Sequence, residues 1–272
     1  MVTVEEVMRI LREGFHAWDP RAQEAVQRFG LELLIRQDAH RIVETVAWLN
    51  GTAASGRLLE IGTGYLGLAM TIRRLFPSAE IVGVEYPGRR YVWSPAYQHR
   101  LRQDRIRLVG CDISASAFPF REASFDAVTL AEVVEHLPPN VLPRFLKDVA
   151  RIVRPGGSLL VTTPNLAAWV NRELLLRGDS PGQQSPLLDI DGAFGHLRLY
   201  TMQELVELLE AAGWRVSRTR YIDQVQLGIS LIRSVIRTFL RVVKSVVPAL
   251  RDTCVIHAVR VGPEQHPGGG RA

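Results

Sequence analysis

Two carboxylates and an imidazole stand within five residues of one another in the segment Glu132-Val133-Val134-Glu135-His136, and a second imidazole, His196, follows later in the chain. An unperturbed imidazole, with a pKa of about 6.5, is substantially neutral at physiological pH and can accept a proton from a hydroxyl group. The same residue types also bind metal ions. The cluster therefore predicts either a general base, His136, with Glu132, Glu135 and His196 supporting it, or part of a metal site.

A second set of reactive residues lies where three apolar stretches end in acids, namely Glu60, Glu85 and Asp112. The first stretch continues into Gly62-Thr63-Gly64 and then into the helix-forming run 66–76. Glycines allow a sharp turn and the close approach of a ligand, and an acid about 20 residues later can accept both hydroxyls of a ribose. This pattern predicts a strand, a tight turn and a helix that together bind a ligand.

Strands and helices alternate from Arg57 onward, which predicts a parallel sheet with helices on both faces. A fourth strand is expected to begin at Ser124, and further strands are expected over 214–222 and 253–261. Ligands of such sheets bind outside the carboxyl ends of the strands. The predicted topology therefore brings the three acids and the segment 132–136 into one crevice.

The motifs resemble those of the class I S-adenosylmethionine-dependent methyltransferases over residues 58–261. The matching pieces are Glu60-x-Gly62-x-Gly64, Glu85, Cys111-Asp112-Ile113, Ala123-Ser124-Phe125-Asp126-Ala127-Val128 and Arg154-Pro155-Gly156-Gly157. The Glu-x-x-Glu-His sequence and the later His-x-Arg-x-aromatic element are similar to the ubiquinone-biosynthesis-type O-methyltransferase branch. The resemblance implies an α/β fold, a Rossmann-like doubly wound seven-stranded sheet with the last strand antiparallel and helices on both faces. In one departure, Leu66 stands where the family usually has a third glycine.

The resemblance also implies a cofactor, S-adenosyl-L-methionine, and residues that bind it. The glycine loop would approach the methionine part, Glu85 would bind the ribose hydroxyls, and Asp112 would accept from the adenine amino group. Carboxylates suit both partners because they only accept hydrogen bonds. The full set of expected cofactor-binding residues is Glu60, Gly62, Thr63, Gly64, Glu85, Asp112, Ile113 and Glu132.

We expect methyl transfer to a hydroxyl, or a similar nucleophile, of a small molecule that is lipid-like or glycosylated. Two alternatives stay open. The cluster around His136 is also similar to the pattern with which small-RNA 3′-terminal ribose 2′-O-methyltransferases hold magnesium, although a bound Mg²⁺ is the less favoured interpretation. Nucleic acid is disfavoured because the net charge of +5 forms no dense basic run. The other alternative, an inactive cofactor-binding or membrane-associated scaffold, has only Leu66 in its support.

Two segments outside the motifs have interpretations of their own. The aromatic and basic stretch 86–93 either closes over the adenine or is a surface turn leading into a helix, and the surface turn is the favoured interpretation. The stretch 168–194 reads as a helix followed by a long loop, where we expect the acceptor to be selected.

An extra segment, 223–251, separates the last two expected strands. On a helical wheel Arg233, Arg237, Arg241 and Lys244 form one stripe, and the other half is apolar. Such a helix is too charged to span a bilayer but can lie on one. The sequence leaves open whether 229–247 makes a peripheral membrane contact, roofs the acceptor pocket, or covers the domain with its basic stripe in water.

The predicted organisation is a helical extension over 1–56, the methyltransferase domain over 57–262 with its amphipathic insertion, and a disordered Gly- and Pro-rich tail over 263–272. In the extension, one helix is expected after the Thr3/Glu6 capping box, and another from Asp19-Pro20 to Leu49. The first residues lack the basic-then-apolar order of a signal peptide, and the two cysteines have no metal-type spacing. We therefore expect a cytoplasmic protein with buried thiols. No pattern indicates its oligomeric state.

Overall fold

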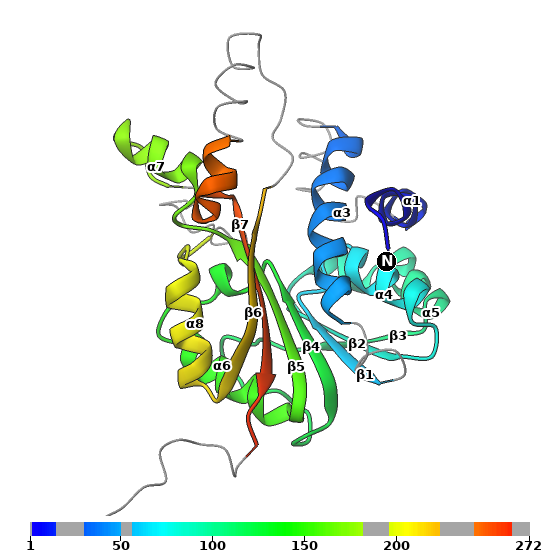
Figure 1. Ribbon diagram of the computed structural model, residues 1–272. Helices are drawn as coiled ribbons and strands as arrows, with labels where there is room; N and C mark the ends of the chain where they lie inside the picture. The colour runs from blue at the N-terminus through cyan, green and yellow to red at the C-terminus, as the bar shows by residue number, and fades with distance from the viewer. Residues whose placement is uncertain (1, 15–29, 50–55, 182–195, 224–241, 263–272) are drawn as a thin grey trace, which may run out of the picture.

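Seven strands form one sheet in the computed structural model, which describes residues 2–14, 30–49, 56–181, 196–223 and 242–262 (Figure 1). The strand order is β3-β2-β1-β4-β5-β7-β6. Strands β1 to β5 pair in parallel, whereas β7 runs antiparallel to both β5 and β6. The strands are β1 (Arg57–Ile61), β2 (Glu80–Glu85), β3 (Ile106–Gly110), β4 (Phe125–Ala131), β5 (Val153–Pro164), β6 (Trp214–Ile222) and β7 (Thr253–Arg260). The predicted fold, with its antiparallel last strand, is confirmed.

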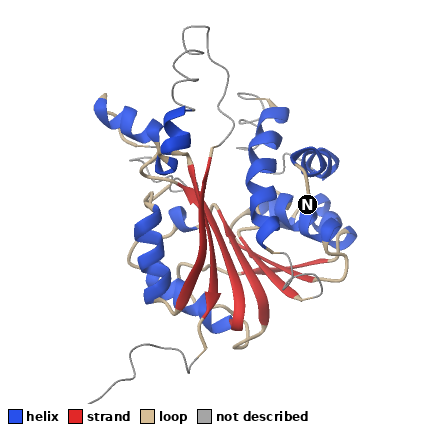
Figure 2. Ribbon diagram, viewed as in Figure 1, coloured by secondary structure: helices blue, strands red, loops and turns tan. Residues whose placement is uncertain are grey.

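Helices cover both faces of this sheet (Figure 2). The α-helices are α1 (Val4–Gly14), α3 (Leu31–Trp48), α4 (Gly67–Leu75), α5 (Pro95–Gln103), α6 (Leu142–Ile152), α7 (Trp169–Leu176) and α8 (Met202–Ala211), and the short 3-10 turns are Arg90–Trp93, Val134–His136 and Pro248–Leu250. The side chains of successive strand residues point to opposite faces of the sheet. Leu58 packs in the core under α1, α3, α4 and α5, while Leu59 packs in the core under α6 and α8.

The N-terminal extension is helical, as predicted, but its second helix is shorter than the sequence suggested. Thr3 and Glu6 form the expected capping box: the Glu6 amide donates to Thr3 Oγ1 at 3.2 Å, and the Thr3 amide donates to Glu6 Oε2 at 2.8 Å. A continuous helix from Pro20 to Leu49 is wrong, because Gly30 has φ 82 and ψ 139, a non-helical conformation, and α3 begins only after it. The expected start at Asp19 lies outside the described residues.

The predicted insertion is described only in part. Residues 224–241, which hold three arginines of the expected basic stripe, lie outside the described residues, as do 182–195 and the tail 263–272. Residues 242–246 are helical. The alternative that places the basic stripe in water is wrong for Lys244, because Lys244 is buried and forms ion pairs with Asp223 at 2.7 Å and Asp252 at 3.2 Å.

Two further sequence predictions concern burial and hydropathy. Cys111 and Cys254 are free and buried, as expected. Within the described ranges, no helix combines the length and the hydropathy that a membrane span requires.

Candidate active site

A cleft of about 570 Å³ opens at the carboxyl ends of the parallel strands. It brings together every predicted cofactor residue and the predicted base: Glu60, Gly62, Thr63, Gly64, Glu85, Asp112, Ile113, Glu132 and His136. Glu135 and His196 do not line it, but each has a potential ligand atom within 4.8 Å of one on His136. The crevice predicted from the strand ends is therefore present, and the predicted base lines it.

The glycine loop between β1 and α4 bends through backbone conformations that favour glycine. Gly62 has φ 78 and Gly64 has φ 48. A Cβ atom on Gly62 would lie 2.8 Å from the Cγ2 atom of Val133, so this position also needs glycine for space. Leu66, the departure from the family pattern, adopts φ 70 and buries its side chain completely in the core under α1 and α3. The loop thus keeps its left-handed bend without the third glycine.

Glu85 at the end of β2 is held firmly at the floor of the cleft. Its Oε2 accepts from the Gly64 amide at 2.9 Å and from the Thr63 hydroxyl at 3.4 Å, and its Oε1 accepts from the Tyr86 amide at 3.0 Å. Arg89 lies beside it, with Nε 3.3 Å from Oε1. Tyr86 and Arg89 line the cleft, so the expectation that 86–93 is only a surface turn is wrong for these two residues.

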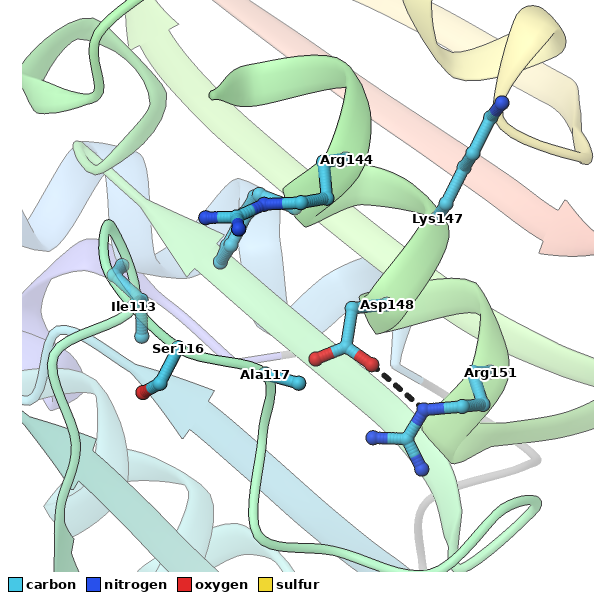
Figure 3. Close-up of a pocket in the computed structure, with 8 residues that line it drawn as sticks. Ile113, Ser116, Ala117, Arg144, Lys147, Asp148 and Arg151 are labelled. Atoms are coloured by element: carbon cyan, nitrogen blue, oxygen red, sulfur yellow. Dashed lines mark hydrogen bonds and ion pairs between the residues drawn. The ribbon is translucent and has the colours of Figure 1, made fainter.

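Asp112 follows β3 by two residues and reaches the cleft on a loop supported from the opposite side by α6. Its Oδ1 accepts from the amide and the hydroxyl of Ser114 at 3.0 and 2.6 Å. Behind the loop is a second cavity of about 290 Å³, where Asp148 pairs with Arg151 (Figure 3). Asp148 also accepts from the Phe118 amide at 2.6 Å, and Arg144 donates to the Ser114 carbonyl at 2.9 Å. These contacts fix the loop that presents Asp112 and Ile113.

Arg41 of α3 is a cleft residue that the sequence analysis missed. Its guanidinium donates to Asp38 at 2.8 Å, and Asp38 in turn accepts a hydrogen bond from the hydroxyl of Tyr65 in the glycine loop. The sequence signal was an Asp and an Arg three residues apart on the buried face of a helix. Among the charged groups around Arg41 is Glu60, whose Oε2 is buried and has no hydrogen-bond partner. Burial raises the pKa of Glu60 to about 8, although Arg41 opposes the rise.

Another part of the cleft is formed by residues that follow β4. Glu132 has φ 58, which is strained for a residue with a side chain, and its Oε1 accepts from Thr162 at 3.0 Å. Glu135 is completely buried and accepts from Thr163 at 2.9 Å, but its Oε1 has no hydrogen-bond partner. Burial raises the pKa of both carboxyl groups, and for Glu135 the neighbouring charge of Glu132 adds to the rise.

His196 is brought against this cluster by backbone hydrogen bonds. The amides of Leu197 and Arg198 donate to the Glu135 carbonyl at 2.8 and 3.2 Å. The rings of His136 and His196 meet edge to face with centroids 4.9 Å apart, and His196 Nε2 lies 4.0 Å from Glu135 Oε1. Burial, and then the proximity of His136, lowers the pKa of His196 to about 4. His196 is therefore neutral at physiological pH.

Three of these residues could hold a metal ion. Glu135, His136 and His196 each offer one ligand atom, and the three atoms lie within 4.8 Å of one another. Glu132, the fourth residue of the predicted cluster, is not part of this group.

Comparison with known proteins identifies the family. The model of the family described as a methyltransferase domain matches residues 23–219. The chain belongs to this methyltransferase family. A probable S-adenosylmethionine-dependent methyltransferase of Mycolicibacterium smegmatis is 37% identical over 101 residues, which are 37% of this chain and 33% of that protein. A demethylmenaquinone methyltransferase of Tropheryma whipplei is 28% identical over 203 residues, 72% of this chain and 81% of that protein.

The fold of this methyltransferase also matches solved structures. The Burkholderia thailandensis 1,6-didemethyltoxoflavin-N1-methyltransferase, bound to 1,6-didemethyltoxoflavin and S-adenosylhomocysteine, superposes with a TM-score of 0.57 at 16% identity, covering 96% of this chain and 92% of that one. The family and the sheet topology together confirm a class I S-adenosylmethionine-dependent methyltransferase. The match spans only about a third of the length of the mycobacterial relative.

Proposed function

We propose that this methyltransferase moves the methyl group of S-adenosylmethionine to a hydroxyl, or a similar nucleophile, of a small lipid-like or glycosylated acceptor. The observation that carries the proposal is that Glu85 and His136 line one cleft. We assign the part around Glu85 to the cofactor and call it the cofactor end, and we assign the part around His136 to the acceptor and call it the acceptor end. The Tropheryma relative supports an apolar acceptor, because its name places its own substrate among the quinones. The relatives give no support to RNA methylation or to an inactive scaffold.

The residues of the cleft fit the cofactor. Glu60 Oε2 is a buried acceptor without a partner, which suits the ammonium group of the methionine part, and Arg41 suits its carboxylate. Glu85 would accept from the ribose hydroxyls, and Asp112 from the adenine amino group, with Ile113 packing beside the ring. When bound, the cofactor supplies a methyl group on a sulfonium, which a nucleophile can displace directly. The chain must therefore orient the acceptor and exclude water.

His136 is the proposed base that removes the proton of the acceptor hydroxyl. It lines the cleft, whereas its neighbours Glu135 and His196 are set back from it. His196 is uncharged and packs edge to face against the His136 ring, so it can fix the ring orientation without competing for the proton. Glu135 fixes the position of His196 through its backbone carbonyl. We propose that this arrangement works without a metal, although three of its atoms are spaced to hold one.

The test uses radiolabelled S-adenosylmethionine with two hydroxylated acceptors, a demethylated naphthoquinol and a simple catechol. His136→Asn is expected to lower kcat about 100-fold or more, because a positioned base contributes a factor of this size. Its affinity for S-adenosylhomocysteine should stay within about threefold of the wild type, because Glu85 and Asp112 do the binding. His99→Asn, an exposed histidine of α5, is the matched control and should have no effect.

Two results would overturn parts of this proposal. An unchanged kcat in His136→Asn would remove His136 as the base. Loss of activity in EDTA, restored by added magnesium, would show that the group Glu135, His136 and His196 holds a cation instead.

A further inference from the structure

Asp38 of α3 joins two cleft residues that come from different parts of the chain. It does not line the cleft itself, yet both of its carboxylate oxygens are used. Its Oδ1 accepts from Arg41 Nη2 at 2.8 Å, and its Oδ2 accepts from the hydroxyl of Tyr65. Arg41 and Tyr65 both line the cleft. Asp38 therefore connects the N-terminal extension to the glycine loop at the point where both meet the ligand site.

Most hydrogen-bond donors of Arg41 are left for a ligand. Its side chain is only 12% exposed, and a guanidinium carries five N–H donors in a rigid fork. Among the residues that the structure describes, only Asp38 accepts a hydrogen bond from it. Glu60 and Glu132 are also among the charged groups around Arg41. A long side chain near three carboxyl groups has several possible orientations, and the hydrogen bond to Asp38 selects one of them.

Tyr65 supports Asp38 from the side of the glycine loop. Burial, and then the charge of Asp38, raises the pKa of Tyr65, so its hydroxyl stays protonated and donates to the carboxylate. The ring needs the space that Gly67 leaves at the start of α4, because a Cβ atom on Gly67 would lie 2.6 Å from Cε2 of Tyr65. Gly67, directly after the departure at Leu66, thus makes room for the contact between the loop and α3.

The helix that carries Asp38 and Arg41 is itself attached to the sheet beyond the cleft. Arg220 of β6 donates to Glu44 of α3 at 2.6 Å. The ring of Trp48, at the end of α3, meets the ring of His257 on β7 edge to face, with centroids 6.3 Å apart. On its other side α3 packs beside α1 and α4 (Figure 1). Asp38 is therefore mounted on a helix that is supported along its length.

We propose that Asp38 is a positioning residue for the cofactor, which holds Arg41 in the orientation that binds the carboxylate of the methionine part. This inference rests on the proposed function in one respect, since the assignment of Arg41 to that carboxylate comes from there. An arginine side chain loses rotamer freedom when it binds a ligand. Because Asp38 already orders Arg41, less of this freedom is lost on binding, and the affinity rises. The effect is confined to the amino-acid part of the ligand.

The test compares two ligands by isothermal titration calorimetry, without acceptor: S-adenosylhomocysteine, which has the amino-acid part, and methylthioadenosine, which lacks it. Arg41→Met should weaken the binding of S-adenosylhomocysteine about 30-fold, because charge-assisted hydrogen bonds are lost. Asp38→Ala should weaken it about tenfold and Tyr65→Phe about threefold, because Arg41 is then less ordered. All three variants should bind methylthioadenosine within about twofold of the wild type, which also shows that they are folded.

Further variants show whether Asp38 acts through Arg41. In the Arg41→Met background, Asp38→Ala should weaken the binding of S-adenosylhomocysteine by no more than about a further twofold. Asp38→Asn keeps one carbonyl oxygen as an acceptor, so its affinity should recover to within about threefold of the wild type. Glu44→Gln is the matched control, because Glu44 is also an ion-paired acid of α3 but does not line the cleft. It should bind both ligands as the wild type does.

Results of three kinds would overturn this inference alone. Unchanged or tighter binding of S-adenosylhomocysteine by Asp38→Ala would mean that Asp38 does not help Arg41 or competes with the cofactor for it. Equal losses for both ligands would show a merely structural role. A full tenfold loss added to that of Arg41→Met would show that Asp38 acts by another route. If instead Arg41→Met has no effect, the assignment of Arg41 fails and the inference fails with it, whereas the role of His136 is untouched by these measurements.

Discussion

At the cofactor end of the cleft, the key carboxylate is held by groups from the adjoining loops, whereas at the acceptor end buried polar atoms are left without partners. Glu85 accepts hydrogen bonds from Gly64, Thr63 and Tyr86, all within or next to two consecutive strand-turn units. Glu135 Oε1 and His196 Nδ1 are buried without hydrogen-bond partners. The difference indicates that Glu85 is positioned before its ligand arrives, while Glu135 and His196 keep buried polar atoms that a water or an ion would satisfy.

The largest expected effect tests whether the two ends act independently. Glu85→Ala should weaken the binding of S-adenosylhomocysteine about 100-fold, because two hydrogen bonds to a charged acceptor contribute about 1.5 kcal/mol or more each. Glu135→Gln, at the other end, should leave this affinity within about threefold. Isothermal titration calorimetry measures both, with Glu80→Ala at the exposed start of β2 as the control. Equal losses in the Glu85 and Glu135 variants would contradict the separation of the two ends.

An effect of intermediate size is expected at Leu66 in the glycine loop, where the family usually has a third glycine. Leu66→Gly relieves the left-handed strain but removes a buried side chain, so it should destabilise the protein by about 2 kcal/mol rather than stabilise it. Leu66→Ala removes nearly the same side chain but keeps the backbone strain. It should therefore lower the free energy of unfolding by about 1 kcal/mol more than Leu66→Gly does. Urea denaturation gives both values. A Leu66→Gly variant more stable than the wild type would show that the core gains little from this leucine.

The smallest expected effect is a pH dependence of stability that comes from Glu60. This carboxyl group belongs to the cofactor end, but like Glu135 it has a buried oxygen without a hydrogen-bond partner. Because the pKa of Glu60 is about 8 in the folded chain, the unfolded chain ionises first, and wild-type stability falls between about pH 4.5 and pH 8. Glu60→Gln cannot ionise, so its stability relative to the wild type should rise by at least about 1 kcal/mol between pH 5 and pH 9.

Thermal denaturation of the ligand-free proteins at the two pH values measures this difference. Glu5→Gln, on the exposed side of α1, serves as the control and should show no such trend. A constant difference between Glu60→Gln and the wild type would mean that Glu60 is already ionised at pH 5, and that Arg41 compensates for its burial.

That the proposed cofactor-binding residues share one cleft could be predicted from sequence because their signals are local. Glu60, Glu85 and Asp112 each follow an apolar run, and the carboxyl ends of parallel strands meet at one edge. Arg41 was missed because it comes from a helix outside the repeating units, and only tertiary packing places it over the glycine loop. The inward turn of Lys244 was missed because a helical wheel shows which residues share a side but not which side faces the protein.

The pairing of β6 with β7 has a consequence for changing the enzyme by design. The two strands pair from Ile222 and Thr253 to Trp214 and Arg260, with one register shift between Val216 and Arg218. Lys244 with its two aspartates closes the end from which the chain departs. The connection between Asp223 and Lys244 could therefore be exchanged for that of a related enzyme as a cassette, with the ion pairs kept as its fixed borders.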